Sequence, residues 1–154
     1  MARSLSALEE EEFRLLSTFC EVLWSRLLPL LPPGIITPET DPRRIIDRFA
    51  AVSRVRALKG LRDAANDLVE MTKDLQGSEL KALNDVLTEA GTGTITHFRK
   101  RRMRRLFEIL RRGRVDTAEE YRLLSAELSD TESPLLSSMS REQGERILAS
   151  YAEP

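Results

Sequence analysis

The sequence predicts an all-α protein, with six or seven helices in an irregular bundle and one long central helix. Apolar residues recur at three- and four-residue spacing through most of the 154 residues, and strand-like alternation is almost absent. Helix-capping residues stand where these apolar patterns begin, and glycine or proline where they end. We expect a single helical domain over 1–154, with disordered ends at 1–5 and 152–154.

The first helix is expected to begin after Ser6 and to end near Leu28. Ser6 and Glu9 form a capping box, in which the serine oxygen accepts an early backbone N–H and the glutamate reaches back. The prolines and glycine within 29–34 then stop the helix and open a turn-rich connector.

The second helix is expected to be the long one. Asp41 is a good N-cap, and Pro42 suits the first helical position. The apolar pattern continues to Leu75 with Gly60 as its main interruption, so we favour one helix over 42–75, straight or bent at Gly60, over the alternative of a break at Gly60. At about 1.5 Å per residue it would be about 51 Å long. A compact protein of this size is only about 40 Å across, which favours a homodimer.

Shorter helices are expected in the second half of the chain. One covers Ser78–Ala90, a glycine-containing loop follows, and a basic helix covers Ile95–Arg112 before Gly113 ends it. A capping signal at 116–119 opens the next helix. The segment 131–154 should hold a loosely packed terminal helix that starts at a capping box, Ser140–Gln143.

Composition indicates a cytoplasmic globular protein. Apolar residues make up 41% and charged residues 32% of the chain. The single cysteine, Cys20, cannot form an internal disulfide. The most apolar run, Leu15–Leu31, contains Glu21, Arg26 and Pro29, so we expect no membrane span.

The basic helix is the most distinctive feature. Residues 99–114 hold nine bases and one acid, whereas the rest of the chain holds fifteen bases and twenty-four acids. A helical wheel places apolar side chains, Phe107 among them, on one half of the circumference. On the other half we expect a basic face of Lys100, Arg101, Arg104, Arg105, Arg111 and Arg112.

An acidic stripe is expected on the long helix. Asp63, Asp67, Glu70 and Asp74 fall within about 60° of one another on the wheel. This stripe and the basic face could meet, within one subunit or across a dimer, and would then set the register of the contact. The alternative is that both faces are simply solvated.

The residues give little support for an enzyme. His97 is the only histidine, and no Glu-x-x-His pair or glycine-rich phosphate loop is present. Cys20 falls on the apolar side of its helix, where a thiol packs and does not react. We therefore predict no catalytic residues, no metal site and no cofactor.

Two functions remain. The first is a non-enzymatic interaction or regulatory protein that presents the basic face to an acidic protein surface, foreign or its own. The alternative is a nucleic-acid-binding protein, because 78–112 has the outline of a helix-turn-helix whose arginines would contact phosphates. The sequence pI of about 6.0 argues against the alternative, because DNA-binding domains are usually basic.

Overall fold

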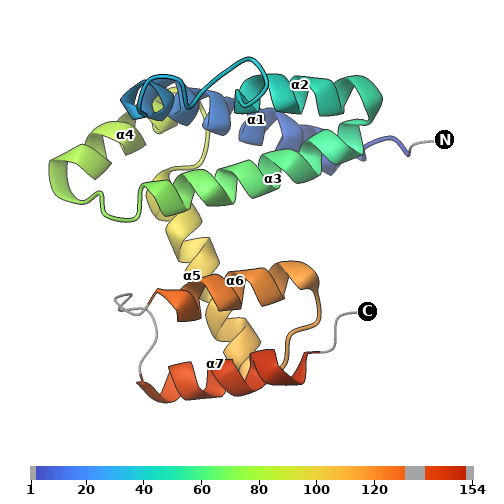
Figure 1. Cartoon of the computed structure of the whole chain (residues 1–154), viewed down its shortest axis with the longest axis vertical. Coiled ribbons are helices and arrows are strands. Elements are labelled where there is room, and N and C mark those ends of the chain that lie inside the picture. The colour runs from blue at the N-terminus through green and yellow to red at the C-terminus, as the bar shows by residue number, and fades with distance from the viewer. Residues whose placement is uncertain (1–2, 131–137, 152–154) are drawn as a thin grey trace. The chain divides into compact units, whose positions relative to one another are not determined.

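The computed structural model describes residues 3–130 and 138–151, and the regular structure within them is entirely helical (Figure 1). This confirms the predicted all-α fold. The described residues form α1 (Ala7–Leu27), the short 3₁₀ helix η1 (Leu28–Leu30), α2 (Pro42–Val52), α3 (Arg54–Met71), α4 (Gly77–Glu89), α5 (Ile95–Arg112), α6 (Ala118–Ser129) and α7 (Ser138–Ser150).

The chain divides into two compact units, Met1–Phe98 and Arg99–Pro154. The boundary falls inside α5, so the first four residues of that helix belong to the first unit. The single domain that the sequence predicts stays a prediction. Of the predicted disordered ends, 1–2 and 152–154 lie outside the described residues, while Leu5 packs against the core of the first unit.

The core of the first unit lies mainly between α1 and α3. Phe19, Leu23 and Leu61 are almost completely buried there, and the only tryptophan, Trp24, is 6% exposed. The capping box at the start of α1 is confirmed, because the Ser6 side chain accepts from the Glu9 N–H and the Glu9 side chain accepts from the Ser6 N–H.

The long helix predicted over 42–75 is wrong, because the chain turns at Ser53. This residue has an extended backbone (φ −158°, ψ 123°), and its Oγ accepts the N–H of Arg56 as the N-cap of α3. Serine competes in this way for backbone N–H groups, and so favours a helix start over a helix interior. Because α2 and α3 are separate helices, no helix of about 51 Å forms over 42–75, and helix length no longer favours a dimer.

The α3 helix continues through Gly60, and this residue lets α2 approach α3. A Cβ at this position would lie 2.9 Å from Cδ1 of Ile46 and 3.3 Å from Cδ2 of Phe49, both on α2. The residue that resembles a helix break in the sequence is thus the contact point of a helical hairpin.

The core of the second unit lies between the later part of α5, α6 and α7. Leu106, Ile109, Leu124 and Ile147 are at most 4% exposed. The backbone of Gly144 lies against Leu124 and Leu128, so α6 and α7 pack closely. Of the segment predicted to be loosely packed, 131–137 and 152–154 lie outside the described residues.

The predicted capping box at Ser140 is wrong, because α7 begins at Ser138 and Ser140 lies within its first turn. The side-chain amide of Gln143 donates to the backbone oxygen of Leu110 at 2.8 Å. A tertiary contact to α5 thus uses the side chain that the sequence assigns to the cap.

Candidate interaction surface on α5

The start of α5 is held by two polar side chains. Thr94 Oγ1 accepts the N–H of His97 at 3.1 Å, and Asn84 Oδ1 accepts the N–H of Ile95 at 2.9 Å. Asn84 also donates to Thr96 Oγ1 at 2.8 Å, so a residue of α4 fixes the first turn of α5. The helix ends at Gly113, whose φ of 80° suits glycine.

The buried side of α5 is narrower than the sequence predicts. Ile95, Leu106, Ile109 and Leu110 are buried as expected, but Phe107 is 45% exposed. Phe107 lies about 100° around the helix from Leu106, beyond the arc that forms the core. The assignment of Phe107 to the apolar side is therefore wrong.

The basic face is at the surface, and it divides into two stripes by helical geometry. Five of the six predicted cations are exposed, and Arg112 is half-buried. The first set, here called the outer stripe, consists of Lys100, Arg104, Phe107 and Arg111. The second, here called the α6-side stripe, consists of Arg101, Arg105, Glu108 and Arg112.

The α6-side stripe contacts carboxylates at the start of α6. Arg112 pairs with Glu120 and also lies 3.2 Å from the carboxylate of Asp116. Arg105 lies 3.7 Å from Glu119, a looser and more exposed pair. Sequence reasoning missed these acids as partners, although Asp116 follows Arg112 by four residues, a spacing typical of helical ion pairs.

Glu120 makes the most buried of these contacts between α5 and α6. It is 8% exposed and, besides Arg112, accepts the backbone N–H of Asp116 at 2.9 Å. The N–H of Glu120 in turn donates to Oγ1 of Thr117, the N-cap of α6, at 3.1 Å. A buried carboxylate is stable in such a place because both an opposite charge and a backbone donor face it.

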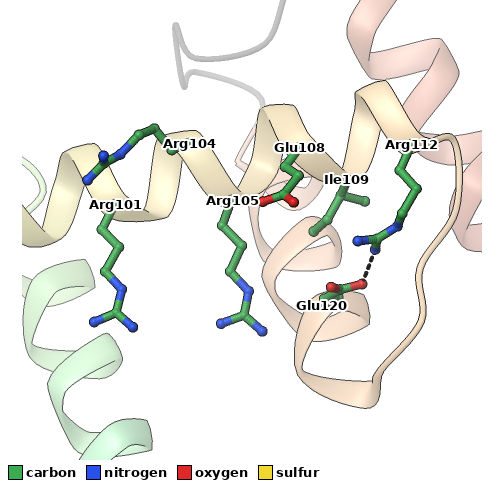
Figure 2. Close-up of a pocket in the computed structure, with 7 residues that line it drawn as sticks. All are labelled: Arg101, Arg104, Arg105, Glu108, Ile109, Arg112 and Glu120. Atoms are coloured by element: carbon green, nitrogen blue, oxygen red, sulfur yellow. Dashed lines mark hydrogen bonds and ion pairs between the residues drawn. The ribbon is translucent and has the colours of Figure 1, made fainter. Parts of the chain in front are cut away.

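Between α5 and α6 lies a hollow of about 380 Å³ (Figure 2). Figure 2 shows Arg101 and Arg105 projecting from the same side of α5, and Arg112 turned toward Glu120. The lining residues are Arg101, Arg104, Arg105, Glu108, Ile109, Arg112 and Glu120. Four guanidinium groups and two carboxylates give the hollow a formal charge of +2.

The predicted acidic stripe is shorter than expected. Asp63, Asp67 and Glu70 lie on α3, but Asp74 lies in the turn beyond its end at Met71. Asp67 is exposed, but partial desolvation raises the pKa of its carboxyl, and the nearby carboxylates of Asp63 and Glu70 raise it further. The predicted match between this stripe and the basic face stays a prediction, because the stripe belongs to the first unit and the whole face to the second.

The remaining observations concern the reactivity of Cys20, metal binding and membrane spans. Cys20 is buried in the first core, and burial raises the pKa of its thiol to about 12, so the reactive thiolate is suppressed. Within the described ranges, no cluster of three or more histidine, cysteine or acidic residues could bind a metal ion. No helix in those ranges is long and apolar enough to cross a membrane.

Comparisons with models of protein families, with curated proteins and with solved structures find no match to this chain.

Proposed function

We propose that this chain is a non-enzymatic helical protein that binds another protein, as an adaptor or regulator, through the basic face of α5. The observation that carries the proposal is the outer stripe. Phe107 is 45% exposed, with Lys100 two turns before it, Arg104 one turn before it and Arg111 one turn after it. Among the described residues, no ion pair with an acid is present for these three cations.

An exposed aromatic ring beside arginines is typical of the centre of a protein interface. Aromatic residues and arginine are enriched there, and they carry a large share of binding energy when a partner excludes water from them. The partner surface that fits is an apolar site surrounded by carboxylates. Electrostatic attraction would then raise the association rate, and Phe107 would slow dissociation.

The acids beside the basic face favour a protein over a nucleic acid. Glu108 lies among the arginines of α5, and Glu119 lies beside Arg105. A duplex presents a phosphate at every step along both strands, so its backbone would meet these carboxylates as well as the arginines. A protein surface can place carboxylates opposite the cations alone.

A second copy of this chain is one protein that supplies carboxylates. Asp63 and Asp67 are exposed on α3, and Met71 at the end of that helix is 53% exposed. Self-association through the stripe and the basic face belongs to the same proposal. It predicts a dimer in sedimentation at tens of micromolar protein, and this dimer should dissociate at high salt. A monomer at low salt would refute self-association.

The test of the proposal is charge reversal with a matched control. Lys100, Arg104 and Arg111 are replaced by glutamate in one variant. Arg26, Arg44 and Lys59, also exposed, are replaced by glutamate in the control, so both variants change the net charge equally. Each is used to capture proteins from a nuclease-treated lysate of the source organism, and captured partners are then titrated in purified form.

We expect the wild type and the control variant to bind the same partner with an association rate that depends on salt. The variant with the reversed outer stripe should not bind this partner. Replacing Phe107 with alanine should weaken the complex about tenfold or more through faster dissociation. Equal binding by the reversed variant would refute the proposal. Binding that disappears with nuclease and returns with duplex DNA would establish the nucleic-acid alternative instead.

A further inference from the structure

The hollow between α5 and α6 has features that binding to an acidic surface does not require. It gathers four arginines around one space, whereas an extended contact needs cations spread along a face. We propose that this hollow binds a phosphoryl group, carried as a phosphomonoester by the protein partner. The inference rests on the proposed function, because it specifies the group that the partner presents.

The residues that line the hollow carry a formal +2, while Glu119 and Asp116, outside the lining, contact Arg105 and Arg112. A phosphomonoester near neutral pH carries about −1.5 to −2 with three acceptor oxygens, so it can replace these exposed carboxylates as the partner of the arginines. A carboxylate brings one charge and two oxygens, and would leave part of the arginine charge uncompensated. Guanidinium groups suit phosphoryl oxygens, because their N–H donors form paired, charge-assisted hydrogen bonds.

The arginines of the hollow differ in the ion pairs that they already form with carboxylates of the chain. Arg112 is fixed by Glu120 and Asp116, so it contributes positive charge at a defined place. Arg105 has only the looser contact to Glu119, at 3.7 Å, and can exchange it for a stronger one. Arg101 has no ion pair among the described residues and projects from the same side of the helix as Arg105 (Figure 2). One fixed and two adjustable arginines form a receptor for a compact dianion.

A phosphodiester fits the hollow less well than a phosphomonoester. Each phosphate of a nucleic-acid backbone carries a single charge, and its neighbours on the strand would approach Glu108 and Glu119. A phosphomonoester ends the group that carries it, so all of its charge enters the hollow. This favours a phosphorylated protein over DNA or RNA as the ligand.

The experiment is an NMR titration that follows the arginine Nε–Hε resonances of the full chain. The probes are inorganic phosphate, O-phosphoserine, serine and sulfate, all at constant ionic strength. We expect phosphate and O-phosphoserine to shift the resonances of Arg101, Arg105 and Arg112 in a saturable way, and serine to leave them unchanged. Because the second pKa of a phosphomonoester is about 6, phosphate should bind more weakly at about pH 5 than at about pH 7.5. Sulfate keeps its charge over this range and controls for any effect of pH on the protein itself.

Variants separate the hollow from the outer stripe. Arg101→Ala with Arg105→Ala should weaken phosphate binding about tenfold or more, because two charge-assisted contacts are lost. Lys100→Ala with Arg111→Ala removes the same charge outside the hollow and should leave the affinity unchanged. Shifts that do not saturate, or equal losses in both variants, would overturn the inference. If phosphate does not bind but the partner is still captured through the outer stripe, only the phosphoryl site is refuted. If neither phosphate nor the partner binds, the proposed function is refuted as well.

Discussion

Replacing Glu120 tests whether the ion pairs of α5 are structural. Glu120→Ala removes the carboxylate that holds Arg112 and accepts the backbone N–H of Asp116. The side chains of Arg112 and Glu120 are 24% and 11% exposed, so this pair lies largely away from water. Its loss should destabilise the second unit far more than the loss of a surface ion pair.

The magnitude follows from what remains after the substitution. Breaking a buried ion pair costs about 3–5 kcal/mol, because a charge is left without a partner. Arg112 keeps the Asp116 carboxylate at 3.2 Å, which reduces the loss to about 2–3 kcal/mol. Glu120→Gln keeps an acceptor for the Asp116 N–H and should cost about 1–2 kcal/mol. Arg105→Ala, which removes only the exposed contact to Glu119, should cost about 0–1 kcal/mol.

The chain carries separate probes for its two units. Trp24 is the only tryptophan and lies in the first unit, while Tyr121 and Tyr151 lie in the second with ring centroids 5.3 Å apart. In urea, Glu120→Ala should lower the midpoint followed by tyrosine fluorescence and circular dichroism. Equal shifts of the Trp24 transition would show that both units unfold together, as the predicted single domain requires. A cost no greater than that of Arg105→Ala would refute the structural role of Glu120.

Three further substitutions or probes test the first unit. Gly60→Val should cost about 1–3 kcal/mol in urea followed by Trp24, because its Cβ would press on Ile46, and a normal midpoint would contradict the packing. Asp67→Asn should raise Tm at pH 7 by removing repulsion of about 0.5 kcal/mol. The pKa of Asp67 is raised in the folded protein, so the gain should shrink as the pH falls and vanish below about pH 3, where both states are protonated. Cys20 should resist thiol reagents at pH 8 until the protein unfolds, and fast labelling would contradict its burial.

Local residues were enough to predict much of this fold. The predicted bounds of α5, Ile95–Arg112, agree with the structure, because a threonine cap, a continuous apolar arc and Gly113 are all local signals. The Asp41–Pro42 start of α2 is confirmed for the same reason. Such features depend on residues within one or two turns of each other, so the sequence carries them directly.

Features that depend on tertiary contacts were not predictable in this way. Ser53 stands in a sequence that reads as continuous helix, and the packing of α2 on α3 adds to its N-cap bond in making a turn there favourable. The exposure of Phe107 depends on how far α6 and α7 extend around α5. The ion pairs of Glu120 depend on the path of the loop after Gly113, which brings back an acid eight residues beyond Arg112.

The division of α5 into two stripes explains how a chain with net charge −1 can present a cationic surface. Residues 115–154 carry nine acids and three bases, enough on the sum alone to offset most of the charge of the helix within its own unit. Charges interact strongly only over about 8–10 Å in physiological salt, so the position of each acid matters more than the sum. Asp116, Glu119 and Glu120 all contact the α6-side stripe, while the described acids form no ion pair with Lys100, Arg104 or Arg111. Neutralisation is therefore confined to one side of the helix, and the other side keeps the charge and the aromatic ring that an acidic partner would bind.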